Sequence, residues 1–339
     1  MQKKPPVRME DVARIAGVSS ITVSRVLNQP GKVAEETRER VLNAIEAVGY
    51  VPNSVAGSLA SRRTSVIAAL VPTITNSIFA DTIHGLTDVL TPAGYQLLLG
   101  ATGYSLEREA QLITALLAQR PAGLLVTGLA HAERARTLMK SAGIPVVETW
   151  NVQGEAVDMA VGFSNYRACY DMVVRLAGNG HRCIGFVCAP TEANDRARER
   201  LRGYRSAIRD LGLPERAELV REAKFSFHAG AESVNRMRAE VPDLDAVFCA
   251  NDILAIGALF ECQRRGVDVP GDLSIAGFDD VELASQVNPG LTTVRIPRYE
   301  IGREAARMLM QRVDGRPVSP GILDLGFEIV ERQSTVRPG

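Results

Sequence analysis

The sequence predicts a small all-α segment followed by an α/β core of two doubly wound parallel sheets. Two observations carry this prediction. Residues 9–28 read as two short helices with a tight turn, and from Ser65 onward apolar strand-like runs alternate with helical patterns. Such alternation is typical of parallel sheets covered by helices on both faces. At 339 residues the chain is long enough for two such units.

Composition and charge separate the two parts of the chain. Hydrophobic residues make up 46% and charged residues 23%, as in a soluble globular protein. The net charge is zero, but the first 63 residues hold ten basic and six acidic residues, so they carry +4 and the remainder −4. A basic N-terminal segment followed by an acidic remainder suits binding of that segment to the phosphate backbone of a nucleic acid. An ordinary solvent-exposed helix surface could carry the same excess of positive charge.

Residue usage also excludes several classes of protein. The five cysteines are scattered without CxxC spacing and the four histidines are dispersed, so neither a metal site nor a cofactor is predicted. No apolar run approaches the length of a membrane span, and the basic N-terminus lacks the apolar region of a secretory signal. We therefore expect a cytoplasmic chain with no membrane partner.

The first helix of the N-terminal pair is predicted from apolar residues at helical spacing: Met9, Val12, Ala13, Ile15 and Ala16. Gly17 supplies the turn, and Ser19 can cap the second helix. Val23, Val26 and Leu27 anchor that helix, and its outward residues are Ser20, Ile21, Thr22, Ser24, Arg25 and Asn28. A face of donors and small residues favours a helix-turn-helix, which fits the DNA major groove, over an ordinary helical hairpin.

A third helix is predicted over residues 35–48, buried through Val41, Leu42, Ile45 and Val48. Ala34 stands at its start, so side-chain capping is weaker there. Residues 53–60 form two helical turns at most, and Gly57 costs about 1 kcal/mol relative to alanine. We do not expect this short segment to be a stable helix by itself.

The core elements are predicted in order along the rest of the chain. The strand-like runs are 66–71, 96–101, 123–127, 145–149, 159–163, 183–188, 246–250 and 273–278. The helical patterns are 77–91, 105–119, 131–142, 165–179, 196–211, 229–240, 252–266 and 298–313. No GxGxxG follows the first strand, so a dinucleotide-binding fold is unsupported.

The helix-turn-helix and the segment 48–60, VGYVPNSVAGSLA, resemble the LacI/purine-repressor family, and the resemblance extends through the whole chain. It implies a DNA-binding headpiece at 1–52, a hinge helix or linker at 53–62 and an effector-binding core at 63–339. The core would have the two lobes of periplasmic binding proteins, with an N-lobe of 63–162 and 292–324 and a C-lobe of 163–291 and 325–339. The chain would cross between lobes near 162–164, 290–294 and 324–327.

The resemblance assigns DNA contacts to the second helix and to the hinge. Ser20, Ile21 and Arg25 match base-reading positions, where arginine can bridge guanine O6 and N7 and isoleucine offers only apolar contact. Phosphate contacts would come from Ser19, Thr22, Ser24 and Asn28. In the hinge, Leu59 matches a residue wedged into a minor-groove step, together with Asn53, Val55 and Ala56. Ile21 could instead be a core residue, and Leu59 could pack on the body.

The second half resembles the gluconate-repressor branch of that family in residues 180–189, 244–270, 273–280 and 323–335. This branch implies a sugar-acid effector of the gluconate or 2-ketogluconate type. Arg196 and Arg200 lie four apart on one helix face, where guanidinium groups can bind a carboxylate. Asn251 and Asp279 follow apolar strands, at the sheet edge that holds ligands. The resemblance adds the cleft walls Ile78, Phe79, Trp150 and Phe225.

Purely structural roles remain open as alternatives for these residues. Arg200 could belong to a solvated row with Arg198 and Arg202. Asn251 and Asp279 could simply cap the helices that follow them.

Together these observations predict a homodimeric transcriptional repressor that binds palindromic operator DNA and is released by a small sugar acid. Two copies are expected because one helix reads only a few base pairs. A solute-binding protein of transport or chemotaxis would use the same two-lobed core, but it would not need the DNA-binding head. An enzyme is less favoured, because the sequence shows no Ser/His/Asp set, phosphate loop or metal cluster.

Overall fold

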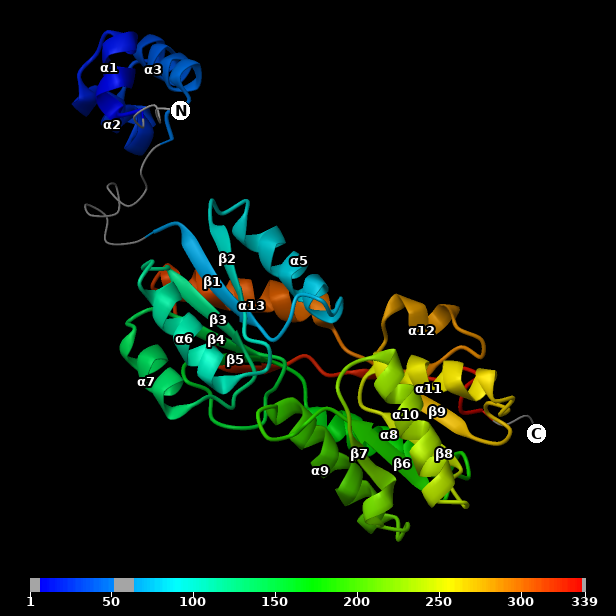
Figure 1. Cartoon of the computed structure of the whole chain (residues 1–339). Helices are drawn as coiled ribbons and strands as arrows, with labels where there is room; N and C mark the ends of the chain where they lie inside the picture. The colour runs from blue at the N-terminus through cyan, green and yellow to red at the C-terminus, as the bar shows by residue number, and fades with distance from the viewer. Residues whose placement is uncertain (1–6, 52–63, 337–339) are drawn as a thin grey trace. The chain divides into compact units, whose positions relative to one another are not determined.

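The computed structural model describes residues 7–51 and 64–336, which fold as two units, Met1–Thr64 and Ser65–Gly339 (Figure 1). The hinge helix predicted at 53–60 lies outside the described residues. The predicted DNA contacts Asn53, Val55, Ala56 and Leu59 therefore lie outside them too.

Residues 7–51 form a small helical bundle. α1 (Met9–Ala16) and α2 (Ser20–Asn28) make the predicted helix-turn-helix, and α3 (Glu35–Val48) follows after the 3-10 helix Pro30–Lys32. The hydroxyl of Ser19 caps α2 by accepting the Thr22 amide at 3.2 Å, whereas Ala34 gives α3 no side-chain cap. The bundle core consists of Val12, Ala13, Ala16, Val23, Val26, Val41, Ala44 and Tyr50.

Two predicted core positions of this bundle are wrong. Ile15 is 51% exposed and Leu42 is 47% exposed. Each is the sequence neighbour of a buried residue, and consecutive residues of a helix point about 100° apart. A bundle of three short helices buries only a narrow stripe of each, so these neighbours face the solvent.

Two sheets in the second unit define an N-lobe and a C-lobe (Figure 1). The N-lobe sheet is parallel throughout, in the order β11-β5-β4-β3-β1-β2. Its strands are β1 (Val66–Val71), β2 (Gln96–Ala101), β3 (Gly123–Thr127), β4 (Val146–Thr149), β5 (Met159–Gly162) and β11 (Ile322–Asp324). Its covering helices are α5 (Ile78–Leu90) and α13 (Arg298–Val313) on one face, α6 (Leu106–Leu117) and α7 (Glu133–Ser141) on the other.

The C-lobe sheet has the order β12-β10-β9-β8-β6-β7 and is parallel except for β12. Its strands are β6 (Ile184–Cys188), β7 (Val220–Glu222), β8 (Ala246–Cys249), β9 (Ser274–Asp279), β10 (Thr292–Arg295) and β12 (Glu328–Val330). Its covering helices are α8 (Asn165–Gly178) and α9 (Asp195–Asp210) on one face, α10 (Phe227–Glu240) and α11 (Asp252–Arg264) on the other. The 3-10 helix Ala217–Leu219 and the short α12 (Glu282–Gln286) complete it.

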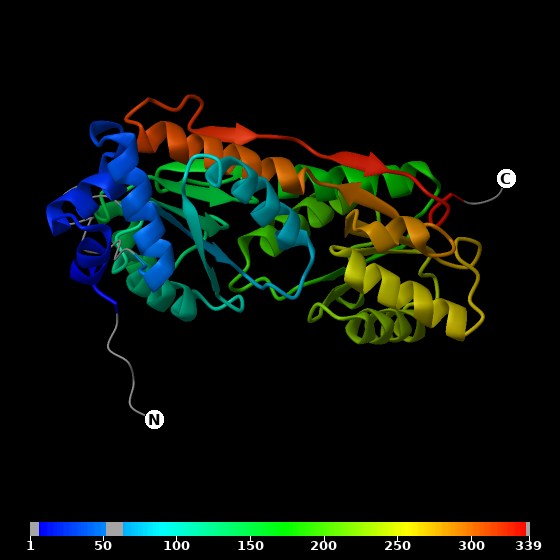
Figure 2. The same ribbon diagram turned by 90° about the horizontal axis from the view of Figure 1, so that it is seen from above.

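The chain passes between the lobes at residues 163–164, 296–297 and 325–327 (Figure 2). The predicted crossing at 290–294 is wrong, because residues 292–295 form β10, which pairs with β9 and β12 inside the C-lobe. Four strands were not predicted: β7, β10, β11 and β12. Each is only three or four residues long and contains polar or charged residues, so none shows the apolar run that revealed the equally short β5 and β8.

Candidate functional site

The outward face of α2 presents two predicted base-reading side chains to the solvent. Ile21 is 72% exposed, and Arg25, four residues later, is also exposed. Residues four apart are neighbours on a helix surface, so the two form one small patch. Because Ile21 lies outside the bundle core, the alternative that it packs inside the bundle is wrong.

The other described residues of α2 and its cap that were predicted to contact DNA are less exposed or are bonded to each other. Ser19 and Thr22 bond to each other, hydroxyl to hydroxyl at 2.9 Å, besides the cap. Ser20, Thr22 and Ser24 are partly exposed, and the side chain of Asn28 lies outside the described residues. Their phosphate-binding roles remain predictions.

A small pocket, with a cavity volume of about 30 Å³, is bounded by residues of both lobes. Several of these residues follow strands, at the carboxyl edges where doubly wound sheets hold ligands, and others lie near the starts of α5 and α9. The N-lobe contributes Ile78, Phe79, Tyr104 and Trp150. The C-lobe contributes Ala189, Asn194, Arg196, Ala197, Arg200, Phe225, Ala250 and Asn251.

Every predicted effector residue except Asp279 is therefore brought together in one pocket. Two polar lining residues, Tyr104 and Asn194, were not predicted. Tyr104 follows β2 as Trp150 follows β4, so its place after a strand was the signal that could have revealed it. Asn194 caps α9 by accepting the Ala197 amide at 3.3 Å.

Arg200 is a buried pocket residue rather than part of a solvated row. Only 7% of it is exposed, whereas Arg198 and Arg202 face the solvent. Its Nε donates to Asn165 Oδ1 at 2.9 Å and its Nη1 to the Ala250 carbonyl at 2.6 Å. Its Cζ lies 3.7 Å from the centroid of the Phe278 ring. These contacts hold the guanidinium in one position.

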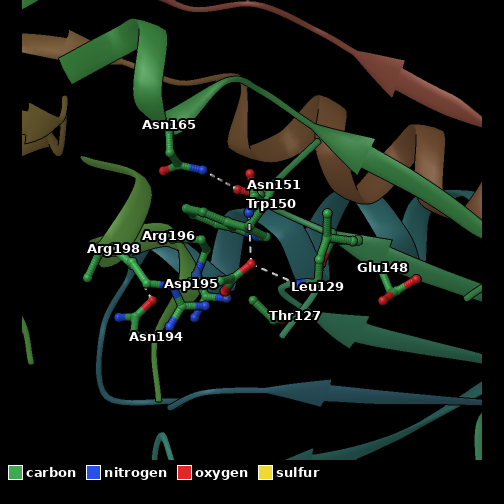
Figure 3. Close-up of polar contacts among 12 residues, drawn as sticks. Thr127, Leu129, Glu148, Trp150, Asn151, Asn165, Asn194, Asp195, Arg196 and Arg198 are labelled. Carbon is green, nitrogen blue, oxygen red and sulfur yellow. Dashed lines mark hydrogen bonds and ion pairs between the residues drawn. The ribbon is translucent and has the colours of Figure 1, made fainter. Parts of the chain in front are cut away.

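Arg196 is equally buried, at 7% exposed, and lines the same pocket. Its Nη1 donates to Oδ1 of Asp195 at 2.8 Å (Figure 3). Two buried guanidinium groups thus face a small cavity, and one of them already has a carboxylate partner. This arrangement suits a ligand that carries a negative charge.

Asp279 lies behind Asn251 rather than on the pocket wall. Asn251 Nδ2 donates to Asp279 Oδ2 at 2.5 Å, and Asp279 Oδ1 has no hydrogen-bond partner among the described residues. Burial raises the pKa of Asp279 to about 6, although Arg200, Arg298 and Asn251 oppose the rise. Asn251 also caps α11 by accepting the Ile253 amide at 2.9 Å. Asp279 does not cap α12, which begins after Val281.

Aromatic side chains form much of the pocket wall. Phe79 and Trp150 have ring centroids 4.9 Å apart, and Tyr104 of the N-lobe lies 5.6 Å from Phe225 of the C-lobe. Burial raises the pKa of Tyr104 to about 12, so its hydroxyl is a neutral donor at pH 7. Trp150 Nε1 has no hydrogen-bond partner among the described residues. Apolar faces, free donors and two cations together suit a small polyhydroxy anion.

His131 fixes the loop between β3 and α7, next to the pocket. Its Nδ1 lies 2.7 Å from Glu109 Oε1 and its Nε2 lies 3.0 Å from Glu148 Oε1. The side chain of His131 is fully buried. Burial acts to lower the pKa of His131, but hydrogen bonds to the two carboxylates raise it to about 9. At neutral pH His131 is therefore an imidazolium. It donates one hydrogen bond to Glu109 of α6 and one to Glu148 of β4, and so links these two elements.

Replacing His131 with glutamine is expected to destabilise the protein in a pH-dependent way. Because the folded-state pKa of about 9 lies above the ordinary value of 6.5, the stabilisation is complete below about pH 6.5 and lost as pH rises through 9. A loss on the order of 2–3 kcal/mol at pH 6 should shrink towards pH 10. Urea unfolding of wild type and variant across this range measures it. The exposed His84→Gln is the control, and an equal loss at all pH values would contradict the charged state.

Within residues 7–51 and 64–336 there is no group of three or more His, Cys, Asp and Glu side chains that could hold a metal ion. All five cysteines are free thiols in buried positions. Over the same residues, no helix has the length and apolar character needed to span a bilayer.

Each of the two units matches a known family of proteins. The sequence pattern of bacterial regulatory proteins of the lacI family matches residues 8–53, and that of the periplasmic binding protein-like domain matches residues 173–335. The chain is 37% identical over 329 residues to the HTH-type transcriptional regulator GntR of Escherichia coli (strain K12), covering 97% of this chain and 98% of the relative.

Solved structures of LacI-family regulators also match nearly the whole chain. A LacI-family transcriptional regulator from Silicibacter pomeroyi matches with a TM-score of 0.92 at 35% identity, over 98% of this chain and 100% of that one. The lac repressor dimer bound to operator and the anti-inducer ONPF matches with a TM-score of 0.85 at 27% identity, also over 98% and 100%.

Proposed function

The chain belongs to the lacI family of bacterial regulatory proteins, and from that premise we propose that it acts as a homodimer on a palindromic operator and is released by a small sugar acid. The chain is a DNA-binding transcriptional repressor of this family, because its near full-length relatives are named as transcriptional regulators. The periplasmic-type core alone would suit a solute-binding protein, but the helix-turn-helix makes that alternative weaker. With DNA as its partner, we place the protein in the cytoplasm.

The observation that carries the sugar-acid proposal is the pair of buried guanidinium groups in the pocket, Arg196 and Arg200. Arg196 is paired with Asp195, whereas Arg200 donates to the neutral Asn165 Oδ1 and Ala250 carbonyl. A neutral ligand would displace water from Arg200 without compensating its charge, and a desolvated unpaired charge is costly. A carboxylate supplies that compensation, while hydroxyl groups can meet Tyr104, Asn251 and the Trp150 indole nitrogen. The resemblance to the gluconate-repressor branch points to the same chemistry.

Calorimetric titration of the purified full chain tests this proposal. The panel is gluconate, 2-ketogluconate, their phosphorylated forms, a neutral sugar of similar size and a purine. We expect at least one sugar acid to bind and the neutral sugar and purine to fail. Binding of the neutral sugar or the purine alone would overturn the sugar-acid assignment and leave only the family membership.

The DNA side of the proposal rests on the α2 patch and on two copies of the chain. Ile21 and Arg25 offer an apolar contact and a bidentate donor, which together can read a few base pairs. A symmetric pair doubles that contact over a palindrome. In support of association, Leu98 and Leu99 are each 38% exposed on β2, an edge strand of the N-lobe sheet.

Leu59→Ala is expected to weaken operator binding by about tenfold, or about 1.4 kcal/mol, while sugar-acid binding and dimerisation stay unchanged. The proposed wedge acts only on DNA, where an apolar side chain stabilises the unstacked step. Fluorescence anisotropy with labelled operator measures the affinity, and gel mobility of a bent operator reports the kink. Unchanged affinity and bend would mean that Leu59 is not the wedge.

A further inference from the structure

Asp195, the first residue of α9, contacts both lobes through its two carboxylate oxygens (Figure 3). Its Oδ2 accepts hydrogen bonds from the Leu129 amide at 2.9 Å and from Asn151 Nδ2 at 2.8 Å, both in the N-lobe. Its Oδ1 accepts one from Arg196 Nη1 at 2.8 Å in the C-lobe. Asp195 therefore joins the two lobes directly behind a pocket arginine.

The N-lobe is shaped to let this carboxylate approach. Gly128, just before Leu129, has a φ of +93°, a backbone conformation that side-chain-bearing residues rarely adopt. A Cβ added there would lie 2.6 Å from Asp195 Oδ1 and 2.2 Å from Arg196 Nη1. A larger residue would therefore force the ends of the Asp195 and Arg196 side chains out of their present positions. Glycine suits both the positive φ and the close approach of this carboxylate.

The carboxylate is charged in this position. Asp195 is 6% exposed, and burial acts to raise its pKa. The charge of Arg196 and the hydrogen bonds from Leu129 and Asn151 outweigh burial and lower the pKa below its ordinary value. If the lobes separated, the two N-lobe donors would be lost, and the carboxylate would keep only Arg196 and water. The contact therefore favours the closed arrangement of the lobes.

We propose that Asp195 is a positioning residue that holds the lobes closed before a ligand arrives and keeps Arg196 in place at the pocket wall. Where the binding-competent state is only partly populated, the apparent ligand affinity falls by that fraction. Loss of the Asp195 contact should therefore open the empty protein and weaken ligand binding. The inference about ligand rests on the proposed function, but the opening of the empty protein does not.

Trp150 is the native probe for this opening. It is the only tryptophan of the chain, it lines the pocket and it is 1% exposed. Its emission maximum and its quenching by acrylamide report how far water and small solutes reach into the pocket. The measurement needs no ligand and no added label.

Two variants disrupt the contact of Asp195 with the N-lobe in different ways. Asp195→Asn removes the charge, and Gly128→Ala keeps every polar group but blocks the approach. The matched controls are Glu199→Gln, a carboxylate on the same helix that pairs with Arg202, and Gly143→Ala, a glycine at φ +66° with open space around it. We expect about a threefold or larger rise in the acrylamide quenching constant for both test variants, and wild-type behaviour for both controls.

Gluconate is then titrated into each protein while Trp150 emission is followed. We expect it to restore protected emission in Gly128→Ala, with an affinity about tenfold weaker than in wild type. Wild-type quenching in both test variants would overturn the role of Asp195, whatever the ligand does. Opened variants in a protein that never binds gluconate would support Asp195 and count only against the sugar-acid proposal.

Discussion

Arg196→Gln is expected to reduce sugar-acid affinity by about 100-fold, or about 2.7 kcal/mol, and to abolish the effect of the sugar acid on operator binding. The ligand carboxylate needs a cation in a cavity where water is largely excluded. Arg196 lines that cavity and points its guanidinium at Asp195, the residue that ties the lobes together. The variant should therefore lose the anchor for the anion, while the helix-turn-helix keeps its affinity for DNA.

Calorimetry with gluconate and 2-ketogluconate, beside operator binding with and without ligand, checks this expectation. Arg202→Gln is the matched control, since Arg202 is an exposed arginine of the same helix paired with Glu199. If Arg196→Gln binds and responds like wild type, the carboxylate is held elsewhere. Arg200 would then be the next residue to test, because it is equally buried in the same pocket.

Arg25→Ala is expected to reduce operator affinity by about 1–3 kcal/mol and to reduce discrimination between operator and random DNA by the same amount. The exposed guanidinium beside Ile21 can make a bidentate contact with a guanine, which carries sequence information. A phosphate contact would instead weaken binding to every sequence and lower the salt dependence.

Anisotropy titrations on operator and on scrambled DNA, each at several salt concentrations, separate these two outcomes. Arg40→Ala on α3 is the control for losing one exposed positive charge from the same unit. Equal weakening on both DNAs would mark Arg25 as a phosphate contact and contradict its base-reading role.

The elements with strong periodic patterns were predictable from sequence, and the weak ones were not. The helix over 35–48 and the strand over 66–71 have the predicted bounds. β10 was missed because four residues, TTVR, give no apolar run; its place is set by pairing with β9 and β12. That single omission moved the predicted crossing between lobes into the wrong segment. Ile15 and Leu42 show the limit for small bundles, where neighbouring apolar residues cannot all be buried.

The pocket was predictable in its chemistry more than in its geometry. The four-residue spacing placed Arg196 and Arg200 on one face, but spacing could not tell whether Arg200 was buried. Its burial depends on Asn165 and on the Ala250 carbonyl, which lie far away in the sequence. Tyr104 and Asp195 were missed for the same reason. A tyrosine after a strand and an aspartate at a helix start are common, and only the meeting of the two lobes gives them partners.

In the proposed function, ligand binding at the pocket arginines controls the affinity of α2 for operator DNA. The most direct measurement is the operator affinity of the full chain, with and without saturating gluconate or 2-ketogluconate, in wild type and Arg196→Gln. We expect the sugar acid to weaken wild-type operator binding by a factor of about 5–150, the range of ordinary coupling energies of 1–3 kcal/mol. The variant should bind operator normally and show no change. Equal operator affinity in wild type with and without every sugar acid tested would contradict the account.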